Sequence, residues 1–156
     1  MTSNSSNLRL AVVGAGLIGR RHVEIIGRCD GVSVSSVTDP SDEAKAFALE
    51  RGLPWYRDLP DMLAGDRPDG VIIATPNQLH VEQGLACVGM RLPVLVEKPI
   101  APDVTSARSL VEAAAEAKVP VLVGHHRRHN PLIAEARQRL LAGEIGDTVA
   151  VHGSFW

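Results

Sequence analysis

The sequence predicts an α/β protein built on a doubly wound parallel sheet, followed by the first helix and strand of a second, α+β domain. Segments with the apolar period of strands and of helices alternate along most of the chain. The inner strands are continuous apolar runs such as residues 71–74, which is typical of parallel strands covered on both faces. A glycine-rich turn joins the first strand to the first helix. We expect a first domain over residues 1–124, and a connecting segment with the start of the second domain over residues 125–156.

The first half of the chain is predicted to alternate between strand and helix. A strand up to residue 13 leads into a helix from Gly16 to near Gly31, and a strand at 32–38 leads into a helix over 42–51. A short strand at 54–56 and a brief helix through residue 62 follow. The apolar faces expected for the two longer helices are Ile18, His22, Ile25 and Cys29 in the first, and Ala44, Phe47 and Ala48 in the second.

The second half continues the alternation and then changes character. After the run at 71–74 we expect a helix over 78–89, a strand at 94–96, a helix capped by Asp103 and running to residue 118, and a strand at 120–123. Asn130 and Pro131 open a last helix that Gly143 ends. The apolar faces expected for the two middle helices are Val81, Leu85 and Val88, and Val104, Ala107, Val111 and Ala114.

Residues 147–156 are predicted to form a half-buried antiparallel strand. Val149, Val151 and Phe155 alternate with polar or small residues, as on a sheet with one solvated face. A single strand cannot bury its apolar face alone. We therefore expect the rest of a sheet-based second domain to lie beyond residue 156.

The composition excludes several classes of protein. The formal net charge of −2 and the absence of a basic surface argue against nucleic acid as a partner. Cys29 and Cys87 lack metal-ligand spacing and are expected to be reduced, small core residues, with no metal site. No secretion leader and no apolar run of membrane-spanning length is evident. We expect a protein of the cytoplasm that does not bind membranes.

The glycine-rich turn has the spacing of a dinucleotide-binding site. Gly14 permits a tight turn, Gly16 lets the backbone approach a pyrophosphate, and Gly19 lets the helix lie close to the sheet. Asp39 ends the second strand, twenty residues after Gly19. A carboxylate there binds an adenosine ribose and repels a 2′-phosphate, which favours NAD over NADP. The alternative is a simple turn or helix-capping acid, and Arg51 or Arg57 could still fold over a phosphate.

Polar segments follow three further strands, at the edge where an open α/β sheet binds its ligands. Thr75, Pro76 and Asn77 are suited to lining a cofactor, although Asn77 could simply cap the next helix. His80 lies in the first turn of that helix, where a neutral polar contact is expected.

Glu97 and Lys98 directly follow a buried strand, and Pro99 restricts the backbone of Lys98 to an extended conformation. A lysine held there could act as acid, base or hydrogen-bond donor to a substrate hydroxyl. The alternative is a surface ion pair.

Residues 125–129, His-His-Arg-Arg-His, suit an anionic or polyhydroxyl substrate or the phosphate side of a cofactor. Neighbouring histidines on an extended segment point to opposite sides, which argues against zinc. A solvated basic turn is the alternative.

Taken together and in this order, these segments resemble the Gfo/Idh/MocA family of oxidoreductases. The resemblance covers residues 9–156 through AVVGAGLIGRRH, the strand-end Asp39, ATPNQLH, VEKPIA and GHHRRHNP. It implies an N-terminal NAD(P)-binding Rossmann domain and a C-terminal mixed sheet that carries oligomer contacts. A catalytic histidine expected from the family would lie beyond residue 156, and His125 and His126 replace the family's usual Phe-Asn-like pair.

The resemblance also implies roles for individual residues. Lys98 matches the active-site lysine, and His126, Arg127 and Lys98 match substrate-contacting positions. The cofactor-binding positions would be Gly14, Gly16, Leu17, Ile18, Gly19, Asp39, Ala74, Thr75, Pro76, Asn77, His80, Glu97, Lys98 and Arg127.

The sequence thus predicts an NAD-dependent dehydrogenase of a secondary alcohol in a sugar, cyclitol or cyclic diol, forming a homo-oligomer as the whole protein. The alternative is a dinucleotide-binding module without catalysis, either truncated or redox-sensing. Flavin enzymes and methyltransferases also use glycine-rich turns of this kind.

Overall fold

The computed structural model describes residues 7–154 of the chain. It divides into two compact units, Met1–Gly124 and His125–Trp156. The first unit holds a six-stranded sheet, and the described residues of the second form a 3-10 helix, an α-helix and a tail without regular secondary structure.

The sheet of the first unit is parallel throughout. Its strands are β1 (Leu8–Val13), β2 (Val32–Thr38), β3 (Trp55–Tyr56), β4 (Gly70–Ile73), β5 (Val94–Val96) and β6 (Val121–Val123), in the order β3-β2-β1-β4-β5-β6. The chain winds outward in opposite directions from β1 and β4. In sheets of this kind, ligands bind at the carboxyl ends of the strands where the winding reverses. The predicted doubly wound fold is confirmed.

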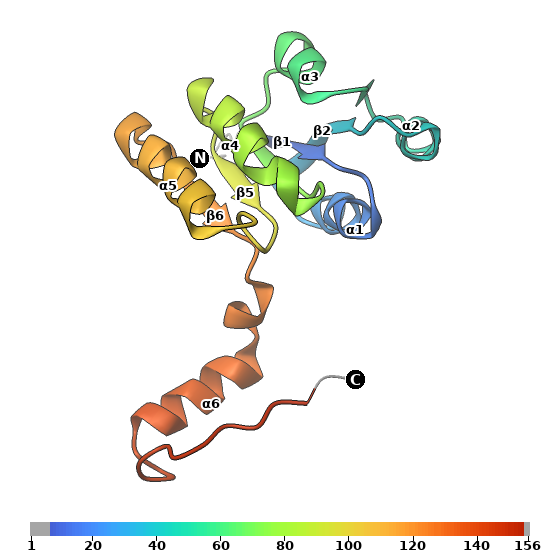
Figure 1. The fold of residues 1–156 in the computed structure, drawn as a ribbon. Coiled ribbons are helices and arrows are strands. Elements are labelled where there is room, and N and C mark those ends of the chain that lie inside the picture. Colours follow the sequence, from blue (N-terminus) through green and yellow to red (C-terminus); the bar gives the residue numbers. More distant parts are fainter. Residues whose placement is uncertain (1–6, 155–156) are drawn as a thin grey trace, which may run out of the picture. The chain divides into compact units, whose positions relative to one another are not determined.

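Helices cover both faces of the sheet (Figure 1). The helices α1 (Leu17–Ile26) and α2 (Asp42–Glu50) pack on one face with Val12 and Ile72. On the other face α3 (Leu59–Gly65), α4 (His80–Gly89) and α5 (Val104–Ala117) pack with alternate residues of the same strands, such as Val13 and Ile73. All four residues of β4 are buried, as its continuous apolar sequence predicts.

The predicted helix caps and the apolar stripe of α2 are confirmed. Asp103 accepts a hydrogen bond from the amide of Ser106 at 2.8 Å, and Asn130 accepts one from the amide of Leu132 at 2.9 Å. Ala44, Phe47 and Ala48 are all buried.

The face predicted for α1 is wrong. Ile18 and Ile25 are exposed, whereas Gly19, Val23 and Ile26 are buried. The reason is the glycine turn, because Gly19 must face the turn that precedes the helix. This rotates α1 and leaves Ile18 at the carboxyl edge of the sheet.

The faces predicted for α5 and α4 are also partly wrong. Leu110 is buried with Ala114, whereas Val104 is 75% exposed and Val111 is exposed as well. A Cβ on Gly84 of α4 would lie 2.9 Å from a methyl group of Leu110, so the fit between the two helices selects Leu110. In α4 itself Val88 is buried as predicted, with His80 and Cys87, while Leu85 is exposed.

The two cysteines differ in environment. Cys87 is buried, and its burial raises the thiol pKa to about 12, whereas Cys29 is exposed. The prediction of a small core residue is confirmed for Cys87 and wrong for Cys29, because α1 ends at Ile26 and leaves Cys29 in the loop that follows.

The second unit is less structured than predicted. Residues His126–His129 form a 3-10 helix rather than an extended segment, and α6 (Pro131–Leu141) follows. The described part of the predicted strand, residues 147–154, forms none, and Val149 is 97% exposed. Among the described residues it has no neighbouring strand with which to pair. Phe155 lies outside the described residues.

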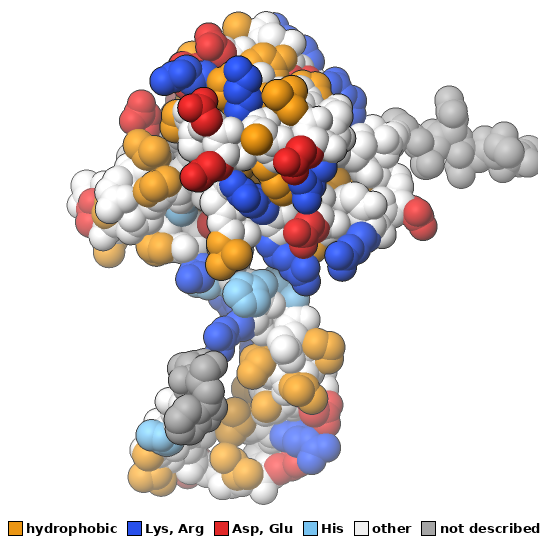
Figure 2. Space-filling model, turned by 90° about the vertical axis from the view of Figure 1, so that its right-hand side faces the viewer, with side chains coloured by type: hydrophobic (Ala, Val, Ile, Leu, Met, Phe, Trp, Pro, Cys, Tyr) orange, Lys and Arg blue, Asp and Glu red, His pale blue; other side chains and the backbone are white. Residues whose placement is uncertain are grey.

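Apolar side chains remain exposed on the second unit, as the hydrophobic colouring of α6 and the tail in Figure 2 shows. They include Leu132, Ile133, Leu140, Leu141, Ile145, Val149 and Val151.

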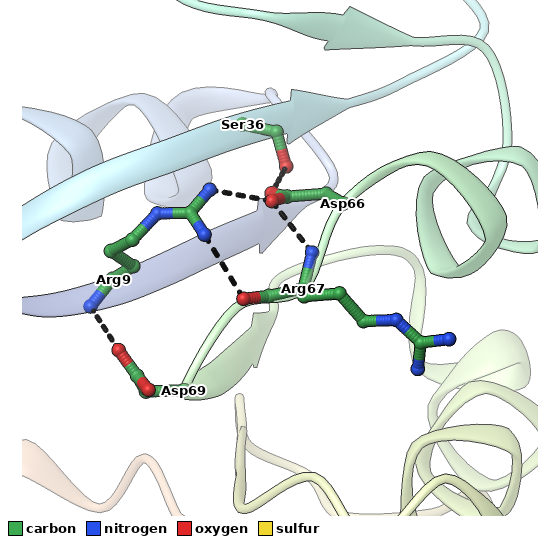
Figure 3. Close-up of polar contacts among 5 residues, drawn as sticks. All are labelled: Arg9, Ser36, Asp66, Arg67 and Asp69. Atoms are coloured by element: carbon green, nitrogen blue, oxygen red, sulfur yellow. Dashed lines mark hydrogen bonds and ion pairs between the residues drawn. The ribbon is translucent and has the colours of Figure 1, made fainter.

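A buried carboxylate joins the α3–β4 connection to the first two strands (Figure 3). Asp66 accepts hydrogen bonds from Arg9 at 2.6 Å, from the Arg67 amide at 2.8 Å and from the Ser36 hydroxyl at 2.9 Å. Burial by itself would raise the pKa of Asp66, but these hydrogen bonds outweigh it and hold the pKa below the ordinary value of 3.8. The carboxylate is therefore ionised at neutral pH and stabilises the fold.

We expect Asp66→Asn to lower the free energy of unfolding by about 2 kcal/mol near neutral pH, because charge-assisted hydrogen bonds are lost. A lowered pKa in the folded state gives stability above the unfolded value, and this stability is lost as the pH falls through the folded value. The difference between wild type and variant should shrink below about pH 3.8. Urea unfolding across this range measures it, with the exposed Asp30→Asn as control. A difference independent of pH would contradict the assignment.

Candidate cofactor site

The glycine turn brings the end of β1 against the end of β4. Gly14 has a φ of +89°, and a Cβ there would lie 2.7 Å from backbone atoms of Ala74 and Thr75. Its amide donates to the carbonyl oxygen of Thr38 at 2.7 Å. The turn is thus held between β2 and β4, and no side chain fits at Gly14.

The start of α1 faces open space. A Cβ on Gly16 would meet no atom within 4 Å, and no side chain caps the helix at this residue. The first amides of an α-helix have no partner within it and carry the positive end of its dipole. The turn therefore leaves room and hydrogen-bond donors for an anionic group such as a pyrophosphate.

A cavity of about 720 Å³ opens at this edge of the sheet. It has the size of a small-molecule site. Its walls come from the ends of β1, β2, β3 and β4 and from the starts of α1 and α4. The lining residues are Val13, Gly14, Gly16, Leu17, Ile18, Thr38, Asp39, Pro40, Arg57, Asp58, Leu59, Ala74, Thr75, Pro76, Leu79 and Gln83.

Asp39 lies in this cavity and also supports the glycine turn. One carboxylate oxygen accepts the amide of Ala15 at 2.8 Å, and the other accepts the amide and hydroxyl of Ser41 at 2.9 and 2.6 Å. Burial alone would raise the pKa of Asp39, but these hydrogen bonds and the charge of Arg20 hold it below its ordinary value. The cavity therefore carries a fixed negative charge beside the glycine turn.

Thr75 and its neighbours form the opposite wall. The Thr75 hydroxyl donates to Gln83 at 2.6 Å, which ties the loop after β4 to α4. Asn77 begins a short 3-10 helix, Asn77–Leu79, and is not among the lining residues.

His80 lies beneath this wall and does not line the cavity. Its side chain is 1% exposed, and its ring nitrogens lie 2.8 Å from the carbonyl oxygens of Pro99 and Thr75. The histidine thus joins the loop after β4 to the loop after β5.

Glu97 and Lys98 lie at the end of β5, next to β4 in the sheet. The Glu97 carboxylate contacts His22 of α1 at 2.9 Å and accepts the amide of Lys98 at 3.2 Å. The Lys98 side chain is exposed. Neither residue lines the cavity.

His126 and Arg127 belong to the second unit, in its 3-10 helix. Their predicted contacts with substrate and cofactor therefore stay predictions.

Several site residues were not predicted from the sequence. Thr38, Leu79 and Gln83 line the cavity, and His22 contacts Glu97. Arg57, which the sequence offered as able to fold over a phosphate, also lines the cavity. The sequence carried no signal of a site role for His22, because this residue fits the apolar period of the helix and was expected on its apolar face.

Two further findings concern residues 7–154. No three His, Cys, Asp or Glu side chains among them gather closely enough to hold a metal ion. None of the helices they form has the length and apolar character needed to span a lipid bilayer.

The chain is similar in sequence to curated dehydrogenases. An inositol 2-dehydrogenase of Mycolicibacterium smegmatis is 41% identical over 152 residues, which are 94% of this chain and 44% of that protein. A 4-carboxy-2-hydroxymuconate-6-semialdehyde dehydrogenase of Sphingobium is 34% identical over 140 residues, which are 88% of this chain and 44% of that protein. The chain spans less than half the length of these relatives.

Solved structures show the same fold. The WlbA dehydrogenase of Bordetella pertussis, in complex with NADH and UDP-GlcNAcA, superimposes with a TM-score of 0.85 at 28% identity, over 90% of this chain and 41% of that chain. A scyllo-inositol dehydrogenase of Lactobacillus casei gives the same TM-score at 23% identity, over 90% of this chain and 43% of that chain.

The model of the oxidoreductase family with an NAD-binding Rossmann fold, GFO_IDH_MocA, matches residues 8–125. The match covers the whole sheet, the glycine turn and the Glu97-Lys98-Pro99 segment. The chain therefore belongs to the Gfo/Idh/MocA oxidoreductase family and contains its NAD-binding Rossmann domain.

Proposed function

We propose that the longer protein carrying this chain is an NAD-dependent dehydrogenase that oxidises a secondary alcohol of a cyclitol, a sugar or a cyclic diol. The observation that supports this best is the placing of an exposed lysine, Lys98, one strand away from the glycine turn and its cavity. The relatives named as inositol 2-dehydrogenases support the class of substrate.

The chain's own residues account for the cofactor half of such a site. The amides at the start of α1 and the open space at Gly16 suit a pyrophosphate, and the ionised Asp39 suits the adenosine ribose. When bound, NAD supplies hydride acceptance at the nicotinamide C4.

Lys98 is the residue we assign to the substrate hydroxyl. Its amine takes up the hydroxyl proton while the hydride leaves the carbon for the nicotinamide C4, so that the alcohol becomes a carbonyl and the amine an ammonium group. His126 and Arg127 orient the substrate through its hydroxyl or anionic groups. The resemblance to the family implies a histidine from beyond residue 156 as the second proton-transfer group.

The charge of Asp39 should decide the choice between NAD and NADP. We expect Asp39→Ala to lower the ratio of NAD to NADP affinity by about tenfold or more, because a charge-assisted hydrogen bond and a repulsion are both removed. Fluorescence titration with NADH and NADPH measures the ratio, which cancels any general damage to the turn. Asp42→Ala, an exposed carboxylate outside the cavity, is the matched control. An unchanged ratio would show that the ribose assignment is wrong.

The test of the activity is an assay of the longer protein with NAD against a panel of cyclitols, sugars and cyclic diols. We expect NADH formation, seen as absorbance, with at least one of them. NAD binding without turnover on any of them would favour a binding module or redox sensor and overturn the proposal. Binding of FAD or S-adenosylmethionine in preference to NADH would show that the glycine turn belongs to a flavin enzyme or a methyltransferase.

We propose further that the protein acts in the cytoplasm as a homo-oligomer. The homo-oligomer is an expectation from the family resemblance. Light scattering of the longer protein tests it, and a monomeric mass would refute it.

A further inference from the structure

We propose that His22 and His80 are positioning residues that hold the Glu97-Lys98-Pro99 segment from both ends and thereby fix where Lys98 presents its amine. The inference rests on the proposed function, because it assigns these histidines to the lysine of that reaction. Neither histidine lines the cavity, so neither is placed to contact the cofactor there.

At the first end, His22 holds the Glu97 carboxylate. The two side chains are mostly buried and lie 2.9 Å apart. A carboxylate can only accept hydrogen bonds, so Nε2 of His22 donates to Oε1 of Glu97. The second oxygen accepts the backbone amide of Lys98 at 3.2 Å. A path of hydrogen bonds therefore leads from α1 through Glu97 to the backbone of Lys98.

Gly124, at the end of β6, leaves the space that this carboxylate fills. A Cβ there would lie 3.0 Å from all three carboxyl atoms of Glu97. An alanine at this position would push the carboxylate rather than the backbone, because the atoms it meets are the far end of a flexible side chain. A Gly124→Ala substitution therefore displaces the Glu97 carboxylate without altering either histidine.

At the second end, His80 holds the carbonyl oxygen of Pro99. Nδ1 lies 2.8 Å from this oxygen and Nε2 lies 2.8 Å from the carbonyl oxygen of Thr75. Both oxygens can only accept, so each contact is a hydrogen bond when the ring nitrogen that makes it carries a hydrogen. The ring is fully buried at the start of α4, so it can reorient little. The segment after β5 is thereby joined to the wall of the cavity after β4.

These contacts link Lys98 to the two parts of the chain that border the cavity. His22 stands on α1, which begins at the glycine turn, and His80 contacts Thr75, which lines the cavity. The Lys98 side chain is exposed. The backbone that carries it is held on both sides, at Glu97 and at Pro99. Displacing a reacting group by about 1 Å can cost about a hundredfold in rate.

Variants of the first end separate positioning from stability. In the longer protein we expect His22→Ala and Gly124→Ala to lower kcat about tenfold or more, with the NADH Kd changed less than about threefold. His22→Gln should recover most of the loss, since its amide nitrogen can replace Nε2 as donor. Arg21→Gln, the exposed neighbour on the same helix, is the matched control.

Variants of the second end use the two ring nitrogens separately. The amide of His80→Asn mimics Nδ1 and keeps the contact with Pro99, whereas that of His80→Gln mimics Nε2 and keeps the contact with Thr75. We expect kcat to fall more in His80→Gln than in His80→Asn. Equal losses that follow the melting temperature would indicate a purely structural histidine and refute the second half of the proposal.

A readout that needs no turnover is the reactivity of Lys98. The lysines of the sequence are Lys45, Lys98 and Lys118, so acetylation followed by mass spectrometry reports Lys98 against two internal references. The acetylation rate of Lys98 relative to these two lysines should change at least threefold in His22→Ala and Gly124→Ala. Unchanged kcat and an unchanged relative rate of Lys98 acetylation in these variants would overturn the inference. Loss of NADH binding or turnover in the wild type would instead refute the proposed function.

Discussion

Replacing Lys98 by alanine should lower kcat of the longer protein by about a hundredfold to ten-thousandfold, the usual contribution of a positioned acid or base. The NADH Kd should change little, because Lys98 does not line the cavity that the glycine turn and Asp39 line. The side chain is exposed, so its removal should leave the free energy of unfolding within about 0.5 kcal/mol. Steady-state kinetics, NADH titration and urea unfolding together measure the three quantities.

Two comparisons make this result specific to the amine at this position. Lys118→Ala removes another exposed lysine, at the end of α5 and away from the site, and should keep kcat. Lys98→Arg keeps the charge but cannot exchange a proton at neutral pH, so its kcat should stay low. A loss below tenfold in Lys98→Ala would assign the proton transfer to another group.

Adding a methyl group at Gly19 should damage both the fold and the cofactor site. The new Cβ, in the first turn of α1, would overlap the carbonyl oxygen of Gly14, and Gly14 belongs to a turn that is held between β2 and β4. Since neither backbone can move freely, we expect a loss of stability of about 3 kcal/mol or more. The amides of α1 would shift with the helix, and the NADH Kd should rise about a hundredfold.

Two other glycines provide the contrast that this prediction needs. Gly16→Ala meets no protein atom within 4 Å, so its stability should be close to wild type while its NADH affinity falls, because the methyl group occupies ligand space. Gly89→Ala, also free of contacts, should lower neither the stability nor the NADH affinity. Equal stability of Gly19→Ala and Gly16→Ala would contradict the assigned packing role.

The limits of the sequence-based predictions are clearest in the helices. The stripe of α2 is confirmed at Ala44, Phe47 and Ala48, which pack with Val12 and Ile72 of the sheet. The stripe of α1 is wrong because the requirement at Gly19 overrides the apolar period. In α5 the space above Gly84 admits Leu110 and leaves Val104 in solvent.

The same division holds within the site. Gly14, Gly16 and Asp39 were found from spacing alone and line one cavity. His80 was expected to border the cofactor, yet it is buried between two carbonyl oxygens. Glu97 was expected at the cofactor, yet its carboxylate faces His22, 75 residues away in sequence.

The sequence by itself determined the order of strands and helices, the glycine turn, the acid after β2 and the lysine after β5. These features depend on local backbone preferences and on the apolar period, both of which are determined by residues close together in the sequence. Only the tertiary structure decided which helix faces are buried and that two histidines hold the segment around Lys98. Such contacts join residues far apart in the chain, and their partners are selected by the space left between packed elements rather than by any local pattern.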